Sequence, residues 1–201
     1  MYHRDLTVVI QAGGRSSRMG RDKGLVPLGG RPMIEHILDA VDDLADDLLL
    51  VTNNPTQYLH FGLRMVGDEV PGAGALPGLR TALRAATDQY VLVVACDMPF
   101  LSRDLLRYQV DLAFETQKDV IVPRWENHLQ TMHAIYKRAT CLKAIENALA
   151  DKQERMISFF PSVLVHKIEP AEVMRYDPHG RSFFSVNTPE NLAEAEKMLG
   201  E

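Results

Sequence analysis

Short apolar runs alternate with amphipathic helical stretches along the first two thirds of this 201-residue chain. The run Leu6–Ile10 is continuous, β-branched at its centre and followed by glycines, which is typical of a strand buried on both faces of a sheet. We expect further strands at 48–52, 63–66, 90–95 and 119–123, with helices at 33–44, 78–86 and 102–115 between them. This alternation predicts an α/β fold whose doubly wound, mainly parallel sheet is joined by right-handed crossovers.

The last third of the chain is less regular. Strands are expected at 131–137 and 162–168, and helices at 140–150 and 187–199, where Thr188 is placed to cap the helix and Pro189 to occupy its first turn. We expect this third to add an antiparallel edge to the sheet and one wall of a substrate pocket. No linker or low-complexity stretch divides the chain, so the sequence predicts one domain over residues 1–201.

Composition excludes some classes of partner. The net charge is −5, which argues against sequence-independent binding to nucleic acid or to a membrane surface. No segment approaches the roughly 20 apolar residues that span a bilayer, and the first residues lack the apolar core of a signal peptide, so a cytoplasmic location is expected. Cys96 and Cys141 stand far apart without metal-ligand spacing and are predicted to be buried thiols.

The segment VVIQAGGRSSRMGRDKG (8–24), between the first strand and the first helix, concentrates positive charge. Gly13 and Gly14 allow main-chain N–H groups to approach an anion closely. The cations that follow them are Arg15, Arg18, Arg21 and Lys23. With Asp22 included, the loop has a net charge of +3 in a protein of net charge −5, so we interpret it as a polyphosphate-binding loop. A solvated surface loop is the alternative.

Two familiar phosphate-binding motifs do not fit this loop. A Walker loop requires Ser or Thr after its lysine, whereas Gly24 follows Lys23. A dinucleotide-binding GxGxxG motif opens a helix directly, whereas here the segment PLGGRP (27–32) precedes the helix.

The loop does resemble that of a known superfamily. QAGGRSSRMGRDKG (11–24) is similar to the (L/A)AGGxSxRMGxxK pattern of nucleotidyltransferases with the glycosyltransferase-A-like fold, which is Rossmann-like. Within that superfamily the chain most resembles the molybdenum cofactor guanylyltransferases, because DKGLVPLGGRPMIEH, CDMPF and NTPENL occur in the same order. The likeness covers essentially the whole chain and implies a nucleotide-binding half at 1–100 and an acceptor-binding half at 101–201.

The resemblance implies roles for residues of the first motif. Those expected to surround the nucleotide are Gln11, Ala12, Gly13, Gly14 and Lys23, the last of them at its phosphates. Arg15 and Arg18 are expected to contact the leaving pyrophosphate. Most relatives carry leucine or alanine where this chain has Gln11, whose amide either touches the base or is simply tolerated.

Later segments match further family positions. Asn53 or Asn54 corresponds to an asparagine near the nucleotide, although either could instead form an Asx-turn. Asp68 matches an aspartate beside the guanosine, where a carboxylate can accept from both the ring N–H and the amine of guanine. The glycine-rich run 72–78 is expected to lead into a helix, with Gly78 beside the base and ribose.

Asp97 is the strongest candidate for a metal ligand. It follows the buried strand at 90–95, where a lone carboxylate is costly unless it is paired or binds a cation. Mg²⁺ is the expected partner, since it takes hard oxygen ligands and bridges carboxylates to substrate phosphates. A turn or helix-capping role is the alternative. Asn187 matches a family position near the metal or the second substrate, and Cys96 is interpreted as small filler rather than a nucleophile.

The segment RWENHLQTMHAIY (124–136) corresponds to a variable loop on the pterin side in the family. Trp125 could stack on a pterin there, and Arg124 or His128 could contact phosphate.

The resemblance implies a Mg²⁺-dependent nucleotidyltransferase that transfers GMP from GTP to molybdopterin and releases pyrophosphate. A phosphate monoester acceptor is mostly ionised near pH 7, because its second pKa is about 6, which fits a sequence without a Ser/His/Asp arrangement. The alternatives are a cytidylyltransferase for the same cofactor, an enzyme acting on a sugar or polyol phosphate, and a regulatory nucleotide-binding protein. Whether other proteins of cofactor biosynthesis bind this chain stays open.

Overall fold

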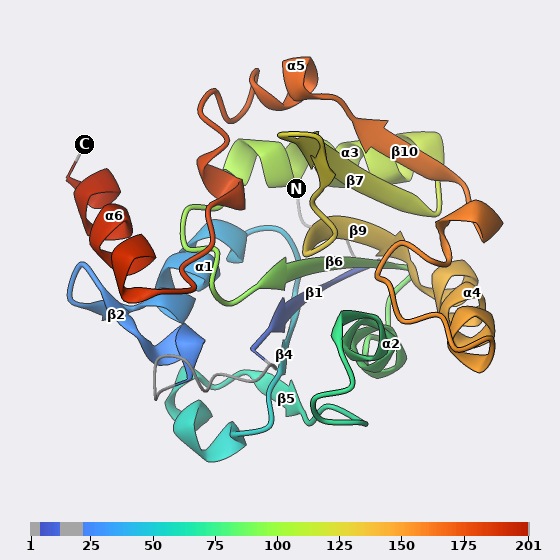
Figure 1. Cartoon of the computed structure of the whole chain (residues 1–201), viewed down its shortest axis with the longest axis horizontal. Coiled ribbons are helices and arrows are strands. Elements are labelled where there is room, and N and C mark those ends of the chain that lie inside the picture. Colours follow the sequence, from blue (N-terminus) through green and yellow to red (C-terminus); the bar gives the residue numbers. More distant parts are fainter. Residues whose placement is uncertain (1–4, 13–21, 201) are drawn as a thin grey trace.

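The computed structural model describes residues 5–12 and 22–200, and a central sheet with helices on both faces organises them (Figure 1). The strands of this sheet are β1 (Leu6–Gln11), β4 (Asp47–Val51), β5 (Arg64–Val66), β6 (Tyr90–Ala95), β7 (Val120–Trp125), β8 (His128–Leu129), β9 (His133–Lys137) and β10 (Val165–Ile168). Their order across the sheet is β10-β7-β9-β6-β1-β4-β5, with β8 paired to β7. A separate two-stranded sheet joins β2 (Pro27–Leu28) to β3 (Arg31–Pro32).

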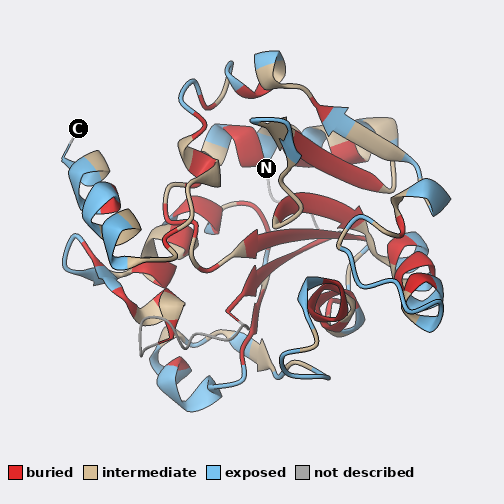
Figure 2. Ribbon diagram, viewed as in Figure 1, coloured by how far each residue is buried: buried red, intermediate tan, exposed pale blue. Residues whose placement is uncertain are grey.

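The helices are α1 (Met33–Val41), α2 (Ala75–Ala85), α3 (Arg103–Thr116), α4 (Arg138–Ala150), α5 (Pro170–Val173) and α6 (Pro189–Leu199). Side chains of the central strands alternate between the two faces: Val8 and Ile10 pack with α1 and α3, whereas Val9 packs with α2 and α4. Both faces are therefore buried, as Figure 2 shows for the middle of the sheet. None of the described helices is long and apolar enough to cross a membrane.

The predicted α/β fold with a mainly parallel sheet is confirmed. β1 pairs in parallel with both β4 and β6, β4 with β5, and β10 with β7. The predicted edge position of the antiparallel strand is wrong, because β9, which is antiparallel to both neighbours, lies inside the sheet between β6 and β7. The short strand β8 is also antiparallel to β7. The edge strand β10 instead runs parallel to its neighbour β7.

A tight turn explains why β9 runs antiparallel. Glu126 and Asn127, between β7 and β8, both have positive φ angles, of 47° and 65°. Two successive positive φ angles are typical of the type I′ turn that joins two antiparallel strands. The chain therefore returns beside β7 at once, and the buried residues 133–136 fill the space between β6 and β7.

Two local features differ from the sequence expectation. Helix α2 begins at Ala75 rather than at 78, because Gly74, with φ of 110°, makes the turn into the helix, and Leu76 is already buried in its first turn. The β2–β3 hairpin was not expected; Gly29 and Gly30, with φ of 59° and 78°, form its turn. By contrast, the predicted Thr188 cap is confirmed, since its hydroxyl accepts a hydrogen bond from Asn191 N at 3.2 Å.

Three neighbouring strands of the sheet, β1, β4 and β6, have their carboxyl ends at the same level. Gln11, the last residue of β1, is level with Val51 of β4 on one side and with Ala95 of β6 on the other. Because these strands are parallel, the segments that follow them lie side by side, and ligands of open α/β sheets bind at such an edge.

The turn between β7 and β8 offers a stability test. Glu126→Gly should raise the free energy of unfolding by about 0.5–1 kcal/mol, because glycine adopts a positive φ without the steric cost that glutamate bears. The matched control, Glu194→Gly, lies at an exposed position within α6 and should lower the same quantity by about 1 kcal/mol. Chemical denaturation measures both, and a loss of stability in Glu126→Gly would contradict this description of the turn.

Candidate active site

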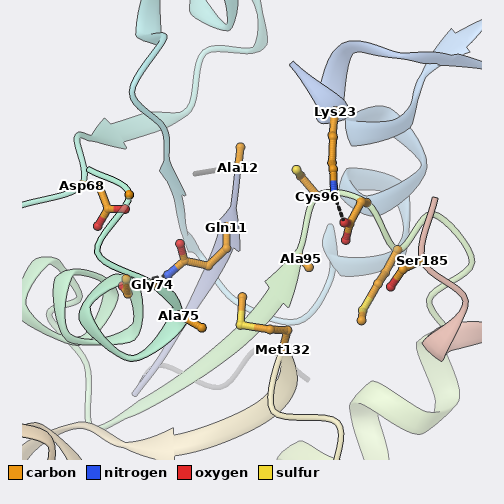
Figure 3. A pocket seen from close by; sticks show the side chains of 14 residues that line it. Gln11, Ala12, Lys23, Asp68, Gly74, Ala75, Ala95, Cys96, Met132 and Ser185 are labelled. Atoms are coloured by element: carbon orange, nitrogen blue, oxygen red, sulfur yellow. Dashed lines mark hydrogen bonds and ion pairs between the residues drawn. The ribbon is translucent and has the colours of Figure 1, made fainter. Parts of the chain in front are cut away.

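A pocket of about 520 Å³ opens at the edge where β1, β4 and β6 end (Figure 3). Six of the residues predicted from the sequence line it: Gln11, Ala12, Lys23, Asp68, Gly78 and Asp97. The other lining residues are mostly small or apolar: Gly72, Gly74, Ala75, Ala95, Cys96, Met98, Met132 and Ser185. Lys23 lies on one side of the pocket, and Asp68 with the beginning of α2 lies on the other (Figure 3). Asp97 lies on the side of Lys23, to which it is hydrogen-bonded.

Lys23, Asp97 and Asn187 meet at the first of these sides. The Lys23 ammonium donates to Asp97 Oδ2 at 2.9 Å and to Asn187 Oδ1 at 2.5 Å. The side chains of Lys23 and Asp97 are 25% and 16% exposed, so both are partly screened from water yet open to the pocket. A positive charge and two hard oxygen atoms thus meet at this side of the pocket, although Asn187 itself is not among the lining residues.

Residues on either side of Lys23 fix its position. Asp22 is 7% exposed, accepts a hydrogen bond from the Tyr58 hydroxyl and accepts another from Asn54 Nδ2 at 3.3 Å. Burial and the contact with Asp22 raise the pKa of Tyr58, so the phenol keeps its proton and remains a donor. Gly24 packs so closely that a Cβ there would lie 2.8 Å from Tyr58 Oη. Asp22 therefore anchors the chain, and Lys23 presents its ammonium to the pocket. Gly24 permits the close packing against Tyr58.

A main-chain hydrogen bond brings Asn187 to Asp97. Val186 N donates to Asp97 O at 2.8 Å, so the segment before α6 lies against the end of β6. Val186 is fully buried in a small apolar cluster with residues of β2, α1 and α6. Asn187 N also donates to Asn191 Oδ1 at 3.3 Å, in the first turn of α6. The capped helix thus holds the Asn187 amide beside the Asp97 carboxylate.

Asn53 and Asn54 are not among the lining residues of the pocket, and each supports a residue of the site instead. Asn53 Oδ1 accepts from the main-chain N–H of Asp68 at 2.9 Å, whereas Asn54 binds Asp22 as described above. Asn54 N also donates to Thr52 Oγ1 at 3.1 Å, so the turn after β4 is closed by a threonine hydroxyl rather than by an asparagine.

The Asp68 carboxylate lines the opposite side of the pocket. Its Oδ1 accepts from the Thr81 hydroxyl of α2 at 3.1 Å, and the same hydroxyl accepts from Glu69 N at 3.2 Å. Thr81 was not identified from the sequence, because a threonine within a helix gives no sign of a partner 13 residues away. These contacts fix the carboxylate but leave Oδ2 without a hydrogen bond to any described residue.

The two cysteines are free and buried, as predicted. Burial raises the pKa of the Cys96 thiol, with a further contribution from the nearby Asp97 charge, so the sulfur stays protonated and is a poor nucleophile. The interpretation of Cys96 as small filler is consistent with this environment.

Arg124, Trp125 and His128, the residues expected on the pterin side, are not among the residues that line the pocket. Arg124 forms an ion pair with Glu169, and Trp125 packs against Phe183 and leaves no room for a Cβ at Gly180. His133 is fully buried, and burial lowers its pKa to about 4, so the imidazole is neutral near pH 7. Met132, from the same segment, does line the pocket, and its apolar side chain gave no functional signal in the sequence.

Several predicted residues of the basic loop lie outside the described residues. They are Gly13, Gly14, Arg15, Arg18 and Arg21. Their roles therefore remain predictions.

The sequence of this chain is similar to those of known proteins over most of its length. The family model of the MobA-like NTP transferase domain matches residues 8–163. The chain is 36% identical over 192 residues to a probable molybdenum cofactor guanylyltransferase of Pelotomaculum thermopropionicum, an alignment that covers 96% of this chain and 92% of that protein. It is 32% identical over 195 residues to the molybdenum cofactor guanylyltransferase of Desulfosudis oleivorans, with 96% of each chain covered.

The fold comparison agrees with the sequence comparison. The crystal structure of molybdopterin-guanine dinucleotide biosynthesis protein A from Archaeoglobus fulgidus superposes with a TM-score of 0.81 at 23% identity, covering 96% of this chain and 98% of that one. The family model spans the strand ends and loops that form most of the pocket, and the curated relatives extend over nearly the whole chain. This chain therefore belongs to the family of MobA-like NTP transferases and is a nucleotidyltransferase.

Proposed function

We propose that this protein transfers GMP from GTP to the terminal phosphate of molybdopterin, releases pyrophosphate, and uses Mg²⁺ bound at Asp97. The observation that carries the proposal is the meeting of a lysine ammonium, a carboxylate and an amide oxygen at one side of a pocket large enough for a nucleotide. The activity in the names of the curated relatives supports the choice of GTP and molybdopterin.

The donor atoms at this side of the pocket suit Mg²⁺. Asp97 Oδ2 and Asn187 Oδ1 already converge on one cation, the Lys23 ammonium, which occupies the kind of position a metal would take. Within the described residues, no group of three or more His, Cys, Asp or Glu side chains is placed to hold a metal ion. Mg²⁺ needs no such group, because it binds through one or two protein oxygens and completes its shell with phosphates and water.

The reaction requires alignment more than acid–base chemistry. An oxygen of the acceptor phosphate forms a bond to the α-phosphorus of GTP, and the bond from that phosphorus to the bridging α,β-oxygen breaks, so that pyrophosphate leaves with the electron pair. The acceptor is already mostly the dianion near pH 7, because its second pKa is about 6. Bound Mg²⁺ supplies charge neutralisation at the phosphates. The protein must therefore position two anions and stabilise the charge that develops on the leaving group.

We assign these tasks, positioning the substrates and neutralising their charge, to different residues of the site. Asp97 and Asn187 supply oxygen ligands, and Lys23 then becomes available for the phosphates of GTP. Asp68, on the far side, presents a fixed carboxylate that matches the N1–H and N2–H donors of guanine, a pair that neither adenine nor cytosine offers. Arg15 and Arg18 are proposed to neutralise the leaving pyrophosphate.

We further propose that residues 1–100 bind the nucleotide and residues 101–201 bind the acceptor. Lys23, Asp68 and Asp97 come from the first half, whereas Met132 and Ser185 bring the second half to the same pocket. A cytoplasmic location is part of the proposal, and the two free buried thiols are consistent with a reducing compartment.

Nucleotide preference tests the function directly. GTP, CTP, UTP and ATP, each with Mg²⁺, are added and the melting temperature is followed, because a ligand at ~100 times its dissociation constant adds about 2.7 kcal/mol of stability. The proposal predicts a shift for GTP alone. A preference for CTP or UTP, or no shift with any nucleotide, would contradict it.

Asp97→Asn should lower kcat about 10²-fold or more, because the variant keeps the shape of the side chain but removes the charge that holds the cation. Asp46→Asn, at an exposed position beyond α1, is the matched control and should retain the parental rate. Pyrophosphate release measures both rates. A kcat of Asp97→Asn within a few-fold of the parent would refute the assigned role.

Lys23→Met should bind Mn²⁺ about fivefold more tightly than the parent in the absence of nucleotide, because the ammonium no longer competes for Asp97 and Asn187, an effect of about 1 kcal/mol. The same variant should bind GTP more weakly. Paramagnetic resonance of free Mn²⁺ measures the first effect, and Lys143→Met, exposed on α4, is the control. Unchanged or weaker Mn²⁺ binding by Lys23→Met would show that the ammonium does not compete with the cation.

A further inference from the structure

Gln11 occupies a position at the centre of the pocket wall, where β1 ends. Its main chain is fixed on both sides, since Cys96 N donates to Gln11 O at 3.0 Å and the next residue, Ala12, donates from N to Val51 O at 2.8 Å. The residue is only 7% exposed, yet its side chain lines the pocket. The side chain therefore has little freedom to leave the site.

One contact fixes the orientation of the Gln11 amide. Nε2 donates to the main-chain carbonyl of Gly78, in α2, at 2.9 Å. A carbonyl oxygen can only accept, so the nitrogen must face Gly78 and the amide cannot be flipped. Gly78 has no side chain that could cover Gln11 Oε1, and even a Cβ there would lie 3.8 Å from that oxygen.

The other end of the amide is therefore an acceptor. Oε1 receives no hydrogen bond from any described residue, because the one hydrogen bond between the amide and the described residues is made by Nε2. Figure 3 shows the Gln11 side chain among the residues that line the pocket. An amide oxygen accepts but never donates. When a ligand displaces water from the pocket, this oxygen must find a donor on the ligand or remain unpaired in a largely buried place, which is costly.

Guanine supplies a donor of the required kind. Its edge carries N1–H and an exocyclic amine with two hydrogens. A carboxylate such as that of Asp68 can accept from N1–H and from one hydrogen of the amine, which leaves the second amine hydrogen without a partner. Asp68 and Gln11 line the same pocket (Figure 3), and both offer acceptors.

We infer that Gln11 is a specificity-determining residue whose Oε1 accepts a hydrogen bond from the exocyclic amine of guanine. The inference rests on the proposed function, because it concerns the base of the same nucleotide. A leucine or alanine at this position would offer no such acceptor. Purines without the amine leave Oε1 unpaired and are discriminated against.

GTP and inosine triphosphate (ITP) differ only in this amine, so the ratio of their affinities isolates the contact. Isothermal titration with Mg²⁺ gives both dissociation constants for the parent and for Gln11→Leu, with Gln11→Met as a second variant of similar length. The variants should bind GTP more weakly than the parent and ITP no more weakly, because they lose the acceptor for the amine and also the unpaired oxygen that ITP leaves, so the preference for GTP over ITP falls about tenfold. Gln89→Leu, at an exposed position before β6, is the control and should keep the parental ratio.

The outcomes separate the inference from the function on which it rests. If the parent binds GTP but the GTP-to-ITP ratio is the same in both Gln11 variants, or if both affinities fall together, Gln11 only supports the pocket wall and the inference is overturned. If the parent does not bind GTP, the proposed function itself fails. A ratio that falls in both variants while ITP binding is retained supports the role of Gln11.

Discussion

The Lys23 ammonium draws together oxygen atoms from segments that lie 74 and 164 residues farther along the chain. Without this contact, the Asp97 carboxylate at the end of a buried strand would have no positive partner among the residues described around it. The contact also defines the chemistry of the site, because an arrangement of oxygens that holds an ammonium can hold a divalent cation with little change. The interaction that holds Lys23, Asp97 and Asn187 together is also the one that a metal and a triphosphate would replace.

The surrounding fold holds the segments that carry Lys23, Asp97 and Asn187 in fixed positions. Parallel pairing keeps Gln11, Val51 and Ala95 level, so three segments leave the sheet together. Asp22 and Tyr58 anchor the chain just before Lys23, and the hydrogen bond from Val186 to Asp97 anchors the chain just before Asn187. Lys23 and Asn187 thus each project from a segment that is fixed at the preceding residue. Such support keeps the groups in place while leaving their polar atoms available to a ligand.

The sequence predicted the parts of this site that depend on local pattern. Asp97 could be identified because it follows a buried strand, which marks the carboxyl end of a strand in a parallel sheet. Lys23 stood out as one of the cations in the glycine-containing loop after the first strand, and its role at the phosphates came from the family resemblance. Asn187 was identified only through a family motif. The roles of Asn53 and Thr81 could not be foreseen, because they depend on contacts between segments that are 15 and 13 residues apart and on which neighbour the fold supplies. The antiparallel direction of β9 agrees with the expectation, but its expected place at the edge of the sheet was wrong for a similar reason: an apolar strand pattern does not state which strands lie on either side, and β9 lies between β6 and β7.

Transfer of labelled phosphate tests the central claim most directly. GTP labelled at the α-phosphate is incubated with the full chain, Mg²⁺ and molybdopterin, and the label and the released pyrophosphate are quantified. The proposed activity predicts that the label enters a pyrophosphate-linked product, with one pyrophosphate released for each label transferred. Binding of GTP without transfer, or transfer from CTP in preference to GTP, would contradict it.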